Sequence, residues 1–177
     1  MYKPAEDTFF LEDALKFYKG KCALGIGIGS GYLTHGLCKN YNLVVGTDIS
    51  FNSLLFAKSN YLKNDNNVFL VCTDLAFPLQ NKFDLIISNP PYLPQESVQF
   101  EDNTVHGGAK GIELSLKLIK NCLPLLNRTG KLLIVRSNLS DLRRMDQMIQ
   151  ELSINKRVVA RKRLFFEELE ILELSKK

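Results

Sequence analysis

The sequence has few of the residues and patterns that build metal centres, disulfide frameworks or membrane spans. It contains two histidines, His35 and His106, and four cysteines without C-x-x-C spacing, so no zinc site is expected. We expect the cysteines to be small buried hydrophobes in a reducing compartment, two of them, Cys22 and Cys72, in buried strands. No apolar run reaches the roughly 18 residues of a membrane helix, and residues 1–7 lack a signal peptide's apolar centre. These absences favour a cytoplasmic protein without membrane contact.

Internal repeats, low-complexity segments and long linkers are also missing. We therefore expect one domain over residues 1–177, long enough to bury most of its apolar surface. The net charge of +4 is mild, but basic residues far outnumber acids between residues 128 and 163. This bias is consistent with RNA contact through the basic C-terminal third, although ordinary solvated helix faces give the same pattern and are the favoured interpretation.

Apolar runs typical of strands alternate with segments of helical periodicity. The predicted helices span residues 7–18, 32–39, 51–63, 112–126 and 142–152, and the predicted strands span residues 22–26, 43–48, 68–72, 83–88, 131–135, 157–165 and 169–174. This alternation predicts an α/β fold, a doubly wound and mainly parallel sheet with helices on both faces and an antiparallel hairpin at its end. Ligands of such sheets bind beyond the carboxyl ends of the strands.

A glycine loop, Gly27-x-Gly29-x-Gly31, follows the first predicted strand and opens a helix. Glycine lets backbone approach a ligand where a Cβ would clash. Asp48 ends the second strand, a position from which a carboxylate accepts hydrogen bonds from both hydroxyls of a ribose. A dinucleotide fingerprint would need glycine at Tyr32, so this spacing, with the motif described next, favours S-adenosylmethionine.

The fourth predicted strand stops at Asn89-Pro90-Pro91-Tyr92, because proline cannot continue a ladder. Asn89 offers a side-chain carbonyl and Tyr92 an aromatic face, which together suit a planar group bearing an NH2. The motif alone does not separate a carboxamide from a nucleobase amine.

Two further features have open interpretations. Asp74 follows the third strand and could accept a hydrogen bond from an adenine amino group, or could cap a turn. Residues 89–111 form a long connection that contains the glycine-rich run 106–111, either a lid over a substrate or a mobile loop.

These motifs resemble the class I S-adenosylmethionine-dependent methyltransferases that carry an N-P-P-Y signature. Residues 2–15 are similar, more narrowly, to the short archaeal and eukaryotic HemK-like branch, which methylates the glutamine of the Gly-Gly-Gln motif in class I release factors. The likeness covers nearly the whole chain and includes Asp48-Ile49-Ser50, residues 89–94 and residues 107–111. Longer bacterial members carry an extra N-terminal helical domain, for which we expect no room here.

The resemblance implies a seven-stranded sheet of order 3-2-1-4-5-7-6 with strand 7 antiparallel. The substrate carboxamide would donate its N–H bonds to the Asn89 side chain and the Pro90 carbonyl, while Tyr92 packs on the amide plane. Catalysis would then depend mainly on positioning the substrate nitrogen, since no general base is evident. The implied cofactor contacts are Gly27, Gly29, Gly31, Asp48, Ile49, Asp74 and Asn89, together with Pro4, Glu6, Asp7 and Thr8 of an N-terminal segment folded over the cofactor.

One position departs from the family pattern. Members usually carry an acidic residue two positions before the first loop glycine, where this chain has Gly25. Loss of a charge-assisted hydrogen bond predicts cofactor binding weaker by about 1.5 to 3 kcal/mol, unless Glu6 or Asp7 compensates.

The resemblance also implies a partner, a small zinc-binding activator protein that pairs with the edge of the sheet. In the implied order that edge is strand 68–72, whose apolar residues favour a covered position. Two alternatives to the release factor methyltransferase stay open at this stage. One is a methyltransferase for exocyclic amines of DNA or RNA, and the other is a non-catalytic subunit with the same fold.

Overall fold

The computed structural model describes residues 3–77, 79–80, 82–93 and 111–177. The predictions for the lid and for the glycine-rich run up to residue 110 lie outside these residues. In chain order the elements are α1 (Glu6–Leu15), β1 (Gly20–Ile26), α2 (Tyr32–Cys38), β2 (Tyr41–Asp48), α3 (Phe51–Asn60), β3 (Val68–Cys72), β4 (Phe83–Ser88), α4 (Glu113–Cys122), β5 (Leu126–Ser137), α5 (Leu142–Glu151), β6 (Asn155–Arg163) and β7 (Glu168–Ser175).

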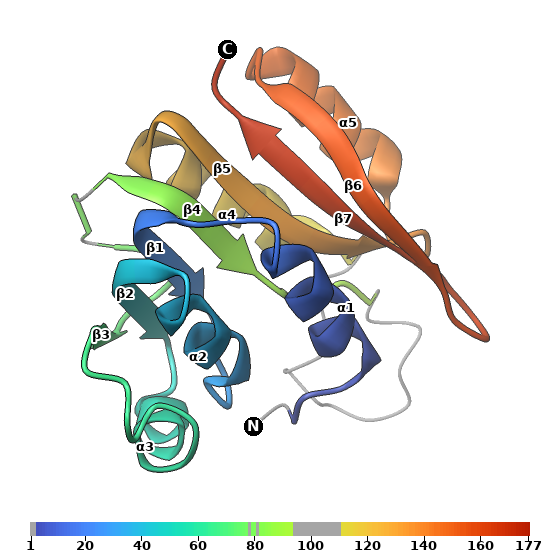
Figure 1. Cartoon of the computed structure of the whole chain (residues 1–177). Helices are drawn as coiled ribbons and strands as arrows, with labels where there is room; N and C mark the ends of the chain where they lie inside the picture. The colour runs from blue at the N-terminus through green and yellow to red at the C-terminus, as the bar shows by residue number, and fades with distance from the viewer. Residues whose placement is uncertain (1–2, 78, 81, 94–110) are drawn as a thin grey trace.

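The seven strands form one sheet of order β3-β2-β1-β4-β5-β7-β6, which confirms the order implied by the resemblance. The strands from β3 to β5 run parallel, while β7 is antiparallel to both β5 and β6. Ile26 of β1 pairs with Thr47 of β2 on one side and with Ser88 of β4 on the other. The carboxyl ends of these three strands therefore meet at one place, as Figure 1 shows.

Two apolar layers hold the helices against the sheet, because successive side chains of a strand point to opposite faces. Leu85 and Ile87 of β4 belong to the layer that includes Leu11 of α1 and Leu37 of α2. Ile86 belongs to the opposite layer, under α4 and α5. Figure 1 accordingly shows α1 and α2 in front of the sheet and α4 and α5 behind it.

Two sequence predictions need correction, one for the helix predicted over 112–126 and one for Cys72. The helix predicted over 112–126 ends at Cys122, because Pro124 has no N–H to donate and lies in a 3-10 turn. Leu126 then begins β5 and pairs with Phe83. Cys72, expected to be buried, is exposed because β3 is the edge strand.

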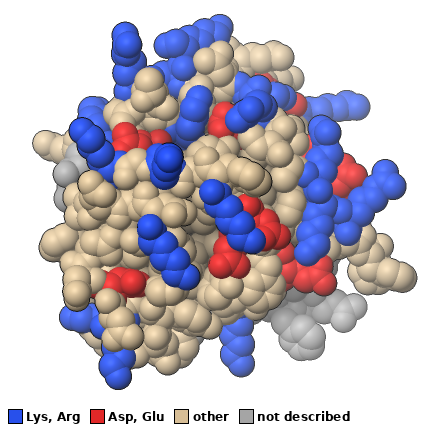
Figure 2. Space-filling model, in the orientation of Figure 1, with Lys and Arg blue, Asp and Glu red and all other residues tan. Residues whose placement is uncertain are grey.

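The basic segment between residues 128 and 163 finds its acidic partners mainly in β7. Arg136 is buried and donates to Glu170 Oε2 at 2.7 Å and to Asp146 Oδ1 at 2.9 Å. Other pairs in this region are Arg157–Glu173, Arg161–Glu170 and Arg163–Glu168. Figure 2 shows lysines and arginines spread over this face with acidic side chains between them. Acids of β7 therefore offset part of the basic excess, and residues 128–177 still hold 12 Lys or Arg against 7 Asp or Glu.

Asp84 ties the start of β4 to the start of β1. Its Oδ2 accepts the backbone N–H groups of Lys21 at 2.6 Å and Cys22 at 2.9 Å, and the Asn127 side-chain amide donates to its Oδ1. Partial burial disfavours the charged carboxylate, but these donors outweigh it and hold the pKa of Asp84 below its usual value.

This lowered pKa predicts a pH-dependent contribution to stability. A carboxyl whose pKa is lower in the folded state stabilises the fold above its unfolded pKa, about 3.9, and the contribution is lost as the pH falls through the folded value. We expect Asp84→Asn to lower the melting temperature at pH 7 by about 2–4 °C and the difference from the wild type to shrink towards pH 3.

Thermal unfolding of both proteins between pH 7 and pH 3 measures this effect. Asp13→Asn is the matched control, because Asp13 bonds to Lys16 on the open surface and should matter little. A melting difference for Asp84→Asn that stays constant down to pH 3 would contradict the assignment.

Candidate functional site

A cavity of about 610 Å³ opens where the carboxyl ends of β1, β2 and β4 meet. Most of the site residues predicted from the sequence line it. They are Pro4, Asp7, Thr8, Gly27, Gly29, Asp48, Ile49, Asp74, Asn89, Pro90 and Tyr92. Two predicted residues, Glu6 and Gly31, are not among the residues that line this cavity.

The glycine loop is held over the end of β2. Gly27 and Gly29 have φ values of +63° and +52°, a backbone conformation that residues with a Cβ rarely adopt. The Ile28 N–H between them donates to the carbonyl of Thr47 at 3.1 Å. A Cβ built on Gly27 would meet no atom within 4 Å, so this backbone faces open space that a ligand can enter.

The third glycine of the loop has a packing role. Gly31 has a φ of +85°, and a Cβ there would lie 2.7 Å from the Cβ of Ala57 in α3. Its missing side chain therefore lets the start of α2 approach α3 closely. Its predicted cofactor contact stays a prediction.

Asp48 connects the glycine loop to α3. Its Oδ2 accepts the Gly29 N–H at 2.9 Å, and its Oδ1 accepts the Ser50 N–H at 2.8 Å. Ser50 in turn caps α3 by accepting the Ser53 N–H at 3.2 Å. Beside the carboxylate, the side chain of Ile49 is 74% exposed along the cavity. Asp48 thus both shapes the loop and lines the cavity.

The structure explains the glycine at position 25. Gly25 is in register with Gly46 on the neighbouring strand. The Ile28 side chain occupies the space over both, because a Cβ on either residue would lie 3.1 Å from an Ile28 carbon. A Cβ at position 25 would also lie 3.1 Å from the hydroxyl of Thr34. An acidic side chain at this position would have to displace Ile28.

The two acids expected to compensate for Gly25 point in different directions. Glu6 pairs with Lys162 Nζ at 3.3 Å, away from the cavity. Asp7 is buried and lines the cavity. Its Oδ1 accepts the N–H of Thr8 at 2.7 Å and the Thr8 hydroxyl at 3.3 Å, which fixes the carboxylate at the first turn of α1. Asp7 is therefore the residue that brings negative charge from α1 to the cavity.

Asn89 is oriented by this carboxylate. Its Nδ2 donates to Asp7 Oδ2 at 2.8 Å, and the Tyr92 hydroxyl donates to the same oxygen at 3.4 Å. Because a carboxylate only accepts hydrogen bonds, the Asn89 NH2 has to face Asp7. Its Oδ1 is buried and has no hydrogen-bond partner among the residues that the structure describes. A buried acceptor of this kind is costly unless it receives a donor, and the N–H of a bound amide or amine would supply one.

Asp74 lies at the rim of the cavity. Its Oδ2 is 2.6 Å from Lys117 Nζ of α4, and its side chain is about half exposed. An adenine amino group bound there would share the carboxylate with Lys117. The adjoining Leu75 has a φ of +54°, and its carbonyl accepts the buried Thr47 hydroxyl at 2.6 Å, which anchors this rim to the end of β2.

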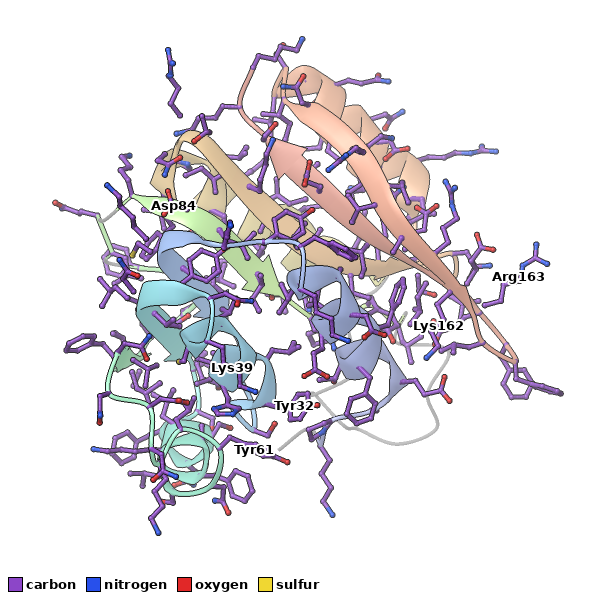
Figure 3. The ribbon with its side chains drawn as sticks, viewed as in Figure 1. Tyr32, Lys39, Tyr61, Asp84, Lys162 and Arg163 are labelled. Atoms are coloured by element: carbon purple, nitrogen blue, oxygen red, sulfur yellow. The ribbon has the colours of Figure 1, made fainter. Side chains whose placement is uncertain are left out.

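Several lining residues were not predicted as site residues. Tyr32 contacts Phe9 and Tyr61 edge to face, with ring centroids 5.6 Å and 5.5 Å away, and Figure 3 shows it beside Tyr61. Its position directly after Gly31 could have revealed it. Ser53, Thr73, Leu114 and Leu118 also line the cavity, and only the tertiary packing of their elements brings them there.

The described ranges contain neither a cluster of possible metal ligands nor a helix of membrane-spanning length and polarity. No group of three or more His, Cys, Asp or Glu side chains there could hold a metal ion. No helix in the same part of the chain is both long and apolar enough to cross a membrane.

Comparison with known proteins identifies the family. The model of the methyltransferase small domain matches residues 6–166. A protein N5-glutamine methyltransferase of Methanocaldococcus jannaschii is 30% identical, over 97% of this chain and 90% of its own length. The catalytic subunit of the Schizosaccharomyces pombe eRF1 methyltransferase is 27% identical, over 85% of this chain and 78% of its own length. The structure of an E. cuniculi Mtq2–Trm112 complex, responsible for methylating the termination factor eRF1, superposes with a TM-score of 0.79 at 24% identity, over 99% of this chain and 98% of that one. The chain therefore belongs to the methyltransferase small domain family and is an S-adenosylmethionine-dependent methyltransferase.

Proposed function

We propose that this protein methylates the side-chain amide of the glutamine in the Gly-Gly-Gln motif of a class I peptide chain release factor. The buried Asn89 Oδ1 beside the glycine loop carries this proposal, because the described residues offer it no donor and a carboxamide N–H would be one. The relatives named as glutamine and eRF1 methyltransferases support it. Such a substrate implies action in the cytoplasm, with residues 1–177 working as one methyltransferase domain.

The residues of the cavity fit S-adenosylmethionine. Gly27 leaves open space over its backbone, and Asp48 presents a carboxylate to a ribose. Ile49 offers an exposed apolar side chain for an adenine ring. When bound, the cofactor supplies an electrophilic methyl group on a sulfonium ion. Family members usually carry an acid at position 25 that helps to bind the cofactor. Asp7 takes over that role here, since it lines the same cavity.

The chain's own residues would position the substrate nitrogen. Asn89 Oδ1 accepts one N–H of the carboxamide and the Pro90 carbonyl accepts the other, while the buried Tyr92 ring packs on the amide plane. Asp7 holds Asn89 in the orientation that this requires. Fixing both hydrogens directs the nitrogen at the methyl group, so the rate enhancement comes from orientation.

Mass spectrometry of a release factor incubated with the protein and S-adenosylmethionine tests the substrate. We expect one methyl group on the Gly-Gly-Gln glutamine. Methyl on DNA or RNA alone would refute the proposal in favour of an exocyclic-amine methyltransferase.

We do not propose RNA contact through the basic C-terminal third, because many of its side chains have acidic partners within the protein.

We also propose that a small zinc-binding activator protein pairs with β3. This strand is the edge of the sheet, and its Phe69 is 61% exposed. Phe51 and Leu55 of the adjacent α3 are 61% and 49% exposed, so the edge is flanked by further apolar surface. An uncovered apolar edge strand is a liability that a partner removes. The partner in the E. cuniculi complex supports this proposal.

Co-purification of the chain with the activator tests this interface. Phe69→Lys should abolish the complex while leaving the sheet intact, because the side chain points to solvent. Phe17→Lys, an exposed phenylalanine on the loop after α1, is the control. A wild-type chain with full activity as a monomer would contradict the need for an activator.

Asp48→Ala should weaken S-adenosylmethionine binding by about 10- to 100-fold, because the carboxylate's hydrogen bonds to the ribose are lost. Since Asp48 also accepts two backbone N–H groups, we expect a stability loss of about 1–2 kcal/mol with cooperative unfolding retained. Calorimetric titration and thermal unfolding measure the two effects. Collapse of cooperative unfolding would show that Asp48 is mainly structural.

A further inference from the structure

A second hollow, of about 600 Å³, lies beside the first on the side of the β6–β7 hairpin. Its walls are the first turn of α1, Tyr92 and hairpin residues 163–167. Asp7 and Tyr92 line both cavities, so the hollow adjoins the site that contains Asn89. The Lys162–Glu6 ion pair links the hairpin to α1 at this point.

The turn of this hairpin displays two phenylalanines. Phe165 is 92% exposed and Phe166 is 83% exposed, and their rings pack edge to face with centroids 4.6 Å apart. The turn itself is well anchored, because the Leu164 N–H donates to the Glu167 carbonyl at 2.8 Å and the Ser137 hydroxyl donates to the Glu167 carboxylate at 2.5 Å. Figure 1 shows the hairpin projecting beyond the sheet. Exposed aromatic side chains on a firm support are typical of a contact surface.

The geometry of the first cavity indicates which molecule meets this surface. Gly27, Gly29 and Asp48 place the cofactor on the side of β1 and β2, and Asn89 lies at the end of β4. A polypeptide that places a glutamine on Asn89 has to leave the cavity on a side that the cofactor does not fill. The hollow beside Tyr92 lies on such a side.

The charges around the hollow favour a protein over a nucleic acid. Lys162 pairs with Glu6, and Arg163 pairs with Glu168 at 3.2 Å, so both of these basic residues, which Figure 3 labels, have acidic partners. Glu167 adds a further carboxylate to the lining. A phosphate backbone would meet these acids, whereas apolar side chains of a protein would meet the two phenylalanines.

We propose that Phe165, Phe166 and the adjoining hollow dock the substrate protein through apolar residues that flank its methylated glutamine. This inference rests on the proposed function, and it assigns substrate affinity to a surface outside the chemical site. The phenylalanines act on binding of the whole substrate protein and leave the transfer step itself unchanged.

Steady-state methylation of a release factor by the double variant Phe165→Ser, Phe166→Ser tests the proposal. We expect KM for the release factor to rise about tenfold or more, as for exposed aromatic anchors of an interface, with kcat and S-adenosylmethionine affinity unchanged. The melting temperature should also stay unchanged, since neither ring is buried. Phe17→Ser is the matched control, because Phe17 is 87% exposed and lines neither cavity.

The possible failures can be told apart. An active wild-type protein whose double variant keeps the same KM would overturn the docking surface alone. A wild-type protein that methylates no release factor would overturn the proposed function and this inference with it. Binding of single-stranded RNA that the double variant loses, with methylation unaffected, would assign the surface to RNA and overturn a protein partner.

Discussion

Asn89→Ala should reduce kcat for glutamine methylation by about 100- to 1000-fold, because the acceptor that orients the substrate nitrogen disappears. The backbone of β4 and the Pro90 carbonyl stay in place, and so does the cofactor side of the cavity. Because Asn89 is only one of the many predicted cofactor contacts, we expect the affinity for S-adenosylmethionine to change by no more than about threefold. Single-turnover methylation and calorimetric titration separate the two quantities.

The neighbouring Ser88 provides the control for this variant. Its hydroxyl donates to the Ile26 carbonyl at 3.0 Å inside the sheet. Ser88→Ala should therefore lower stability modestly and leave kcat largely unchanged. If Asn89→Ala kept more than a tenth of the wild-type kcat, Asn89 would not be the main positioning group.

Asp7→Asn should lower kcat by about 10- to 100-fold although the change is isosteric. Asn89 Nδ2 would lose its charged acceptor, and the Asn89 amide could then turn its NH2 towards the cavity, where it would oppose the substrate NH2. The effect should appear in kcat and not in the melting temperature alone. Measured kcat, KM and unfolding curves of the variant test this expectation.

A reversed pair distinguishes positioning by Asp7 from a merely structural role. Asn89→Asp alone would set two carboxylates against each other at the present 2.8 Å contact, so it should be both inactive and destabilised. Adding Asp7→Asn restores the hydrogen bond with its direction reversed, because the amide at position 7 then donates to the carboxylate at position 89. The amide oxygen at position 7 would still accept the Thr8 N–H. Recovery of stability and of at least part of kcat in the double variant is expected. No recovery would contradict direct coupling between the two side chains.

The sequence predicted the sheet and most of the residues that the structure brings to the cavity, because their signals are local. The stop at Pro90 and Pro91 marks the end of β4, and the spacing of the glycines marks the loop. The order of the strands came from the family resemblance, and the structure confirms it. The boundary at Leu126 was wrong, because pairing with Phe83 prevailed over a helical pattern there.

Contacts between distant segments could not be predicted in the same way. Nothing in the residues around Glu6 and Asp7 indicates which of the two acids faces the cavity, since that depends on how α1 packs against the sheet. The occupation of the Gly25–Gly46 space by Ile28 likewise depends on the register of two strands. Sequence patterns identified the candidates, and tertiary packing assigned their roles.

The insertion of β7 between β5 and β6 has a consequence for synthesis of the protein. Leu169 and Ile171 of β7 belong to the same apolar layer as Phe10 and Leu11 of α1, the helix that begins beside Asp7. A nascent chain that has not yet released β7 from the ribosome lacks part of the platform for α1. Asn89 then has no firmly placed carboxylate to orient it. Methyl transfer therefore requires that β7 has been made and packed, and products truncated before β7 should be inert.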